Sequence, residues 1–186
     1  MTTKVFIGGS RHVSRLSAAV RERIDNIVAK NLSVVIGDAN GVDKAVQTYL
    51  HGKGYSNVEV FCSDGRCRNN VGSWDVRRVR VDGRHRGAQF YSAKDRAMTH
   101  EADIGFMVWD GESAGTLLNV MRLVGLRKKA VVYIVPSKEF KDFHHGRDWQ
   151  DFFSRCNAEL RSKVEQRASH EMRSGAAGLQ TAFAEL

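Results

Sequence analysis

Three short loops in this 186-residue sequence place glycine beside hydroxyl, carboxylate or cationic side chains, each directly after an apolar run. They read "IGGSRH" at residues 7–12, "GDANGVDKA" at 37–45 and "WDGESAGTLLN" at 109–119. Glycine lets a backbone approach a ligand closely, and free N–H groups at the start of a helix attract phosphate. The three loops therefore predict a site for a phosphorylated ligand.

The first loop offers two kinds of group to a phosphate. Gly8 and Gly9 permit close approach, whereas Ser10 supplies a hydroxyl and Arg11 a guanidinium. The alternative is a tight turn that needs both glycines for its backbone angles alone. This loop is thus a predicted part of the ligand site or an ordinary turn.

The second loop is acidic. Gly37 ends the apolar run, Asp38 and Asn40 can accept hydrogen bonds, and Gly41 permits close approach. Asp43 falls in the first turn of a predicted helix, where a carboxylate is favoured by the helix dipole without any function. We interpret the two acids as ligands for ribose hydroxyls, with helix capping as the alternative for Asp43.

The third loop combines acids with a helix start. Exposed N–H groups at Gly115 and Thr116 would hold phosphate, and an acid beside them would face a sugar or a base. Ser113 also fits an ordinary N-cap. The predicted ligand residues of this loop are Asp110, Gly111, Ser113, Gly115, Thr116 and Asn119, and Glu112 is a further acid.

Short, continuous apolar runs alternate with helical patterns along the chain, which is typical of strands buried on both faces of a parallel sheet. We therefore predict an α/β fold, a Rossmann-like doubly wound sheet of about five parallel strands flanked by helices. The carboxyl ends of such strands meet at one edge, where ligands bind. The predicted strands are 5–7, 34–36, 58–62, 104–109 and 130–135, and the predicted helices are 13–30, 42–53, 93–102 and 113–126.

Three segments lie outside this repeat. Residues 63–92 form an arginine-rich insertion, which we interpret as a lid over a polyphosphate, as a nucleic-acid contact or as a solvated β-hairpin. Lys94, which follows it, fits a phosphate ligand and a surface lysine equally well. Pro136 marks the predicted end of the sheet. Residues 137–173 predict one long amphipathic helix, and residues 174–186 predict a flexible tail.

Composition restricts the setting of the protein. A formal net charge of +8 favours phosphate-bearing partners. Three cysteines, an odd number without paired zinc-ligand spacing, indicate reduced thiols in the cytoplasm, and the scattered histidines form no predicted metal site. No apolar run reaches the roughly 20 residues that a membrane-spanning helix needs. We therefore expect a cytoplasmic protein without metal or membrane contacts.

The stretches "IGGSR", "GDANGVDKA" and "WDGESAGTLLN" resemble the SLOG superfamily, the Smf/DprA–LOG group, and are most similar to its YspA-like branch. "KDRAMTHEAD", residues 94–103, is similar to the helix that members place before their fourth strand. The resemblance covers residues 1–136. It implies a Rossmann-like nucleotide-binding domain with phosphate at Gly115 and Thr116.

One departure from the LOG pattern affects catalysis. Where LOG enzymes carry a glutamate that assists N-glycosidic cleavage, this chain has Asn119, whose amide cannot act as a general base. We therefore expect a sensor or carrier that binds an ADP-ribose-like or other phosphorylated nucleoside, without a further cofactor, as a homodimer or higher oligomer.

Two alternatives remain open at this point. The first is a nucleotide N-glycosidic hydrolase or (deoxy)ribosyltransferase that uses Asp110, Glu112 or Asp38 as its carboxylate. The second is nucleic-acid binding, as in the Smf/DprA relatives, which the basic net charge favours.

Overall fold

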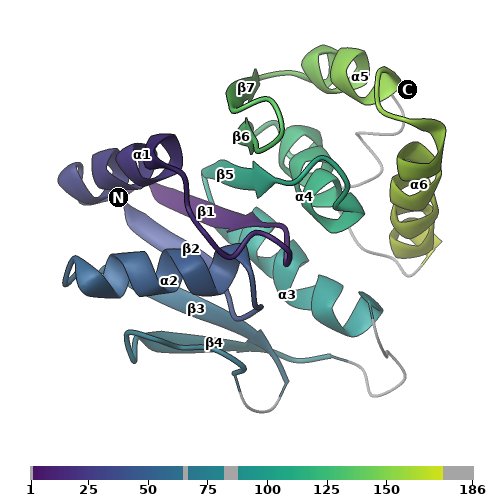
Figure 1. Ribbon diagram of the computed structural model, residues 1–186. Coiled ribbons are helices and arrows are strands. Elements are labelled where there is room, and N and C mark those ends of the chain that lie inside the picture. The colour runs from purple at the N-terminus through teal and green to yellow at the C-terminus, as the bar shows by residue number, and fades with distance from the viewer. Residues whose placement is uncertain (1, 65–66, 82–87, 174–186) are drawn as a thin grey trace.

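The computed structural model describes residues 2–64, 67–81 and 88–173, and these form an α/β fold around one seven-stranded sheet (Figure 1). The strand order is β4-β3-β2-β1-β5-β6-β7, with β7 antiparallel to β6 and all other neighbours parallel. This confirms the predicted doubly wound class. The strands are β1 (Lys4–Gly9), β2 (Ser33–Gly37), β3 (Val58–Ser63), β4 (Asp75–Val79), β5 (Ile104–Trp109), β6 (Lys129–Ile134) and β7 (Glu139–Phe143).

Helices cover both faces of the sheet. α1 and α2 lie on one face and α3 and α4 on the other, as right-handed crossovers between parallel strands require (Figure 1). All four predicted helices are present, although α3 begins at residue 88 rather than 93. The helices are α1 (Ala18–Ala29), α2 (Val42–Gly52), α3 (Ala88–Glu101), α4 (Ala114–Gly125), α5 (Gly146–Ser154) and α6 (Ala158–Arg173).

The core consists of two layers that the sheet separates. Alternate residues of β1 point to opposite sides, so Phe6 belongs to the layer under α3 and α4, whereas Val5 and Ile7 belong to the layer under α1 and α2. Burial on both faces explains why the strands read as continuous apolar runs.

Two strands lie beyond the predicted five. The first, β4, falls inside the arginine-rich segment and pairs in parallel with β3, so the hairpin interpretation is wrong for the described part of that segment. Arg77 of β4 forms ion pairs at 2.9 Å with Glu59 and with Glu101. An alternation of apolar and charged residues indicates an exposed edge strand, but it does not specify the direction of that strand.

The second, β7, shows that Pro136 does not end the sheet. The chain reverses after β6 through a turn in which the Lys138 N–H donates to the Ile134 carbonyl at 2.8 Å. β7 then pairs with β6 along the edge that β6 would otherwise leave open. Proline prevented β6 from continuing, but it did not prevent the chain from returning to the sheet.

The predicted C-terminal helix is two helices, α5 and α6. The helix is interrupted at residues 155–157. The Asn157 side chain caps the second helix by accepting a hydrogen bond from the Leu160 N–H at 2.8 Å. The predicted apolar stripe does face the core, because Trp149, Phe153 and Val164 are buried with α4. The predicted tail, 174–186, lies outside the described residues, as do residues 82–87 of the arginine-rich segment.

The oxidation state of the cysteines differs from the one expected. Cys62 at the end of β3 is joined to Cys67 by a disulfide, so the expectation of three reduced thiols is wrong, and only Cys156 is a free thiol. The spacing of two cysteines in sequence did not reveal that the chain turns back on itself after β3. Among the described helices, none has the length and apolar character to cross a membrane.

Candidate functional site

The three loops singled out in the sequence meet at the carboxyl edge of the sheet. β1 lies between β2 and β5, which is the point where strand order reverses and where α/β proteins bind ligands. Backbone hydrogen bonds join the loops: the Ser10 N–H donates to the Val108 carbonyl at 3.0 Å, and the Val42 N–H donates to the Ser10 carbonyl at 3.1 Å. The Ser10 hydroxyl also donates to the Asp110 carboxylate, so Ser10 links all three loops.

The glycines of the first loop serve the packing of the sheet. A Cβ on Gly9 would lie 2.2 Å from the Val108 carbonyl oxygen, and a Cβ on Gly8 would lie 3.0 Å from the Phe6 ring. These contacts explain the glycine pair without a ligand. Arg11, the next residue but one, is exposed at the surface.

Asp110 is the centre of the β1–β5 corner, which we define as residues 10–12 and 110–116. Its carboxylate accepts hydrogen bonds from the Ser10 hydroxyl and from the N–H groups of Glu112 at 3.1 Å and Ser113 at 2.8 Å. The His12 imidazole lies 3.3 Å away and is 83% exposed. Partial burial acts to raise the pKa of Asp110, but these hydrogen bonds hold it below its ordinary value.

The N-terminus of α4 is partly occupied by its own cap. The Ser113 hydroxyl oxygen accepts from the Thr116 N–H at 3.4 Å and from the Thr116 hydroxyl at 3.0 Å, and Thr116 is buried. Gly115, in contrast, has room for a Cβ, which would make an ordinary contact with the Arg167 guanidinium at 3.6 Å. Gly111 has a φ of +91° and forms the tight turn before the helix.

Asn119 lies inside the protein. Its amide oxygen accepts a hydrogen bond from Arg122, whose guanidinium also contacts Glu171 of α6. All three side chains are buried. Arg122 thus connects α4 to α6, and Asn119 holds its guanidinium from the same helix. The sequence did not reveal Arg122 or Glu171, because the two lie 49 residues apart.

The β2–α2 corner, which we define as residues 37–43, is closed by residues from elsewhere. Asp38 is buried and its two carboxylate oxygens bind the Arg68 guanidinium at 2.6 and 3.2 Å, while the Arg68 N–H donates at 3.0 Å. The Asn69 amide donates to the Asp38 carbonyl at 2.8 Å and to Asn40 at 3.1 Å. Burial acts to raise the pKa of Asp38, but Arg68 holds it below its ordinary value.

Lys94 completes this corner from α3. Its side chain is 4% exposed, and its ammonium lies 2.9 Å from Asp95 and 3.9 Å from both Asp38 and Asp43. Burial raises the pKa of Asp43 to about 6, although Lys94 opposes the shift. Lys94 is itself buried, yet the neighbouring carboxylates raise its pKa above the ordinary value.

The glycines of this corner are required by close packing. A Cβ on Gly37 would lie 2.4 Å from the Asp43 carboxylate and 2.5 Å from the Lys94 ammonium. Gly41 has a φ of +81°, and a Cβ there would lie 2.4 Å from the Arg11 backbone. Glycine at these two positions brings the first and second loops together and makes room for the buried charges.

The polar residues around the site therefore divide into buried and accessible ones, and the predicted ligand residues Ser10, Thr116 and Asn119 are among the buried ones. Asp38, Asp43 and Lys94 are buried and neutralise one another together with Arg68. A ligand can reach the exposed residues Arg11, His12, Asn40 and Glu112 and the partly exposed residues Asp110 and Gly115. His12 and Arg68 were not among the predicted ligand residues, although Arg68 lies within the arginine-rich segment that the sequence singled out.

This arrangement offers an exposed guanidinium, an imidazole, an ionised carboxylate and the start of a helix around the point where strand order reverses. Such groups suit an anionic ligand that also carries hydroxyls. Comparison of the chain with protein-family models, with curated proteins and with solved structures found no match.

Proposed function

We propose that the protein binds a nucleotide or another phosphorylated nucleoside, of the ADP-ribose kind, at the β1–β5 corner, as a sensor or carrier. The observation that supports this most is the meeting of three glycine-containing loops at the reversal of strand order. The resemblance of the same three loops to the SLOG superfamily supports the same class of ligand.

The charges of the site residues suggest how the ligand would be oriented. Phosphate would lie toward Gly115 and Arg11, because a helix start and a guanidinium attract anions. Hydroxyls of the sugar would lie toward Asp110 and Asn40, whose oxygens accept hydrogen bonds. Asp38 is already bound to Arg68, so we no longer propose it as a ribose ligand.

A charge placed at Gly115 tests this proposal. Gly115→Asp adds a carboxylate at the start of α4, where a Cβ has room beside the Arg167 guanidinium. We expect it to weaken AMP or ADP-ribose binding at least about tenfold in calorimetry, because the added charge repels phosphate. Gly52→Asp is the matched control, since a Cβ at Gly52 meets no atom within 4 Å. Absence of binding of either nucleotide to the native protein would refute the proposal.

A second candidate function is N-glycosidic cleavage of the bound nucleotide by Asp110. The observation that favours it is a carboxylate that its neighbours keep ionised beside the exposed His12. An ionised carboxylate can stabilise an oxocarbenium ion, and an imidazole can transfer a proton to the departing base. Chromatography of a nucleotide incubated with the protein decides between the two: recovery of the intact nucleotide supports binding alone, and release of free base that Asp110→Asn abolishes supports cleavage.

A further inference from the structure

The second half of the sheet is covered on one face only. α4 packs on β5 and β6, and α5 and α6 pack on the same side, where Phe143 and Trp149 are buried with α4. On the opposite face, α1 lies beside β1, and no described helix follows it across β6 and β7 (Figure 1). Phe140 of β7 is on this face and is 39% exposed.

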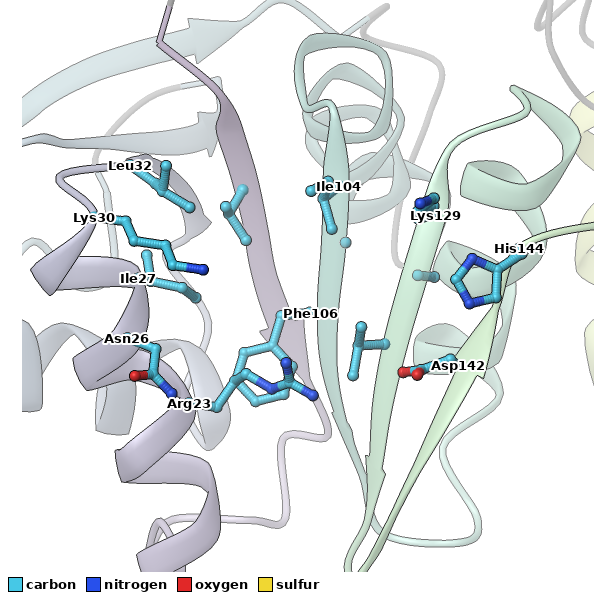
Figure 2. A pocket seen from close by; sticks show the side chains of 14 residues that line it. Arg23, Asn26, Ile27, Lys30, Leu32, Ile104, Phe106, Lys129, Asp142 and His144 are labelled. Carbon is cyan, nitrogen blue, oxygen red and sulfur yellow. The ribbon is translucent and has the colours of Figure 1, made fainter.

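A groove runs along this open face (Figure 2). It has a volume of about 270 Å³ and lies between α1 on one side and β7 on the other. Its floor is apolar: Ile104 and Phe106 of β5 lie in the middle, with Ile27 of α1 on one side. Val131 of β6, which also lines the groove, is the register partner of Phe106. Water in contact with such a floor would be released by an apolar ligand, which favours binding.

The rim of the groove is mainly cationic. Arg23 comes from α1, Lys30 is the C-cap residue that follows α1, and Lys129 is the first residue of β6. Against them stands one carboxylate, Asp142, with His144 next to it (Figure 2). The side chains of Lys30 and Lys129 are exposed, and within the described residues their ammonium groups form no hydrogen bond or ion pair; the Lys30 backbone N–H donates to the Asn26 carbonyl at 3.2 Å. The rim therefore complements an anion, whereas the floor complements an apolar body.

We propose that this groove binds a small amphiphilic carboxylate, with its hydrocarbon part on the floor and its carboxylate near Lys30 and Lys129. The volume is close to the lower end of small-molecule sites, about 300 Å³, and is too small for a folded partner. Ile104 and Lys129 begin their strands, so the groove lies toward the amino ends of the parallel strands. It is separate from the β1–β5 corner at the carboxyl ends.

Decanoate is the probe that tests this site, with its methyl ester as the uncharged counterpart. We expect decanoate below its micellar concentration to shift the backbone NMR signals of the groove residues in the labelled full-length protein. The ester should bind at least about tenfold more weakly, because it lacks the charge that the rim complements. Decanoate that does not bind, that shifts signals elsewhere, or that binds no better than its ester would overturn the proposal.

A pair of surface substitutions separates the site from a general effect of charge. Lys30→Glu with Lys129→Glu should weaken decanoate binding at least about tenfold and leave the fold intact, because both side chains are exposed. Lys44→Glu with Lys141→Glu makes the same change in net charge at exposed positions outside the groove and should not weaken binding. Equal losses in the two double variants would also overturn the proposal.

Discussion

The two corners at the carboxyl edge of the sheet are alike in sequence but different in structure. Each corner has an acidic residue, Asp38 or Asp110, next to a glycine, and a helix begins within a few residues after it. In the β2–α2 corner, cations from other elements bind the acids, so Asp38 is 5% exposed and Asp43 is 9% exposed. In the β1–β5 corner, Asp110 binds neighbouring hydroxyl and N–H groups and stays beside an exposed histidine.

This difference indicates a division of roles. Buried charges that neutralise one another hold the second loop in place, whereas the carboxylate of Asp110 is held by hydrogen bonds and its side chain is 15% exposed. Substitutions of the buried charges in the β2–α2 corner should therefore mainly change stability, and those in the β1–β5 corner should mainly change ligand binding.

The largest expected effect is at Lys94. Lys94→Met removes the buried ammonium but keeps a similar apolar stem, so three carboxylates lose their shared cation. We expect the free energy of unfolding in urea to fall by about 3–5 kcal/mol. Lys44→Met, an exposed neighbour of Asp43, should change it by less than about 0.5 kcal/mol. Similar values for the two variants would show that the β2–α2 corner does not depend on its buried cation.

The disulfide should stabilise the same corner by a smaller amount. Cys62 and Cys67 are five residues apart, and closure of so short a loop is worth about 2 kcal/mol, which a phosphine reductant should remove. Arg68 follows Cys67 directly, so reduction should also loosen its hold on Asp38. The decrease in the free energy of unfolding caused by Arg68→Ala should then be smaller in reduced protein than in oxidised protein. If the two decreases in unfolding free energy are strictly additive, the disulfide and the Arg68–Asp38 pair stabilise the protein independently.

The pH dependence of stability should reflect Asp43. Its pKa is about 6 in the folded protein against an ordinary value of 3.8, so the folded state binds the proton more tightly than the unfolded chain does. The contribution of Asp43 to stability is therefore fully present below about pH 4 and is lost as the pH rises to about 6. Its slope is at most about 1.4 kcal/mol per pH unit.

Asp43→Asn removes this contribution and should flatten the curve of unfolding free energy against pH between those limits. Asp38 and Asp110 do not interfere, because their lowered pKa values affect stability below pH 3.8. Urea titrations of both proteins at half-unit steps measure the two slopes. Parallel curves would mean that Asp43 titrates as an ordinary exposed carboxyl.

The smallest expected change in stability is at Asp110. Asp110→Asn keeps one acceptor oxygen for the N–H groups of Glu112 and Ser113, so the free energy of unfolding should fall by only about 1 kcal/mol. Its effect on nucleotide binding, measured by calorimetry, should exceed that of Arg68→Ala. If Asp110→Asn severely destabilises the protein but leaves nucleotide binding unchanged, the assignment of a binding role to the β1–β5 corner is wrong.

Much of the architecture could be predicted from local patterns. Continuous apolar runs are sufficient to indicate buried parallel strands, and all five predicted strands are present. The same alternation predicted that the loops after β1, β2 and β5 share one edge of the sheet. The edge strands β4 and β7 escaped prediction because a half-exposed strand has a weaker pattern and pairs on one side only.

By itself, then, the sequence determined the class of the fold, the helices between its central strands and the edge at which its polar loops gather, because these depend on residues close together in the chain. Only the tertiary structure decided which acids are buried and which stay accessible. Arg68 lies 30 residues from Asp38, and Lys94 reaches Asp43 from a helix on the other face of the sheet. Burial and charge act through space, so a carboxylate's pKa and accessibility depend on neighbours that are distant in the chain.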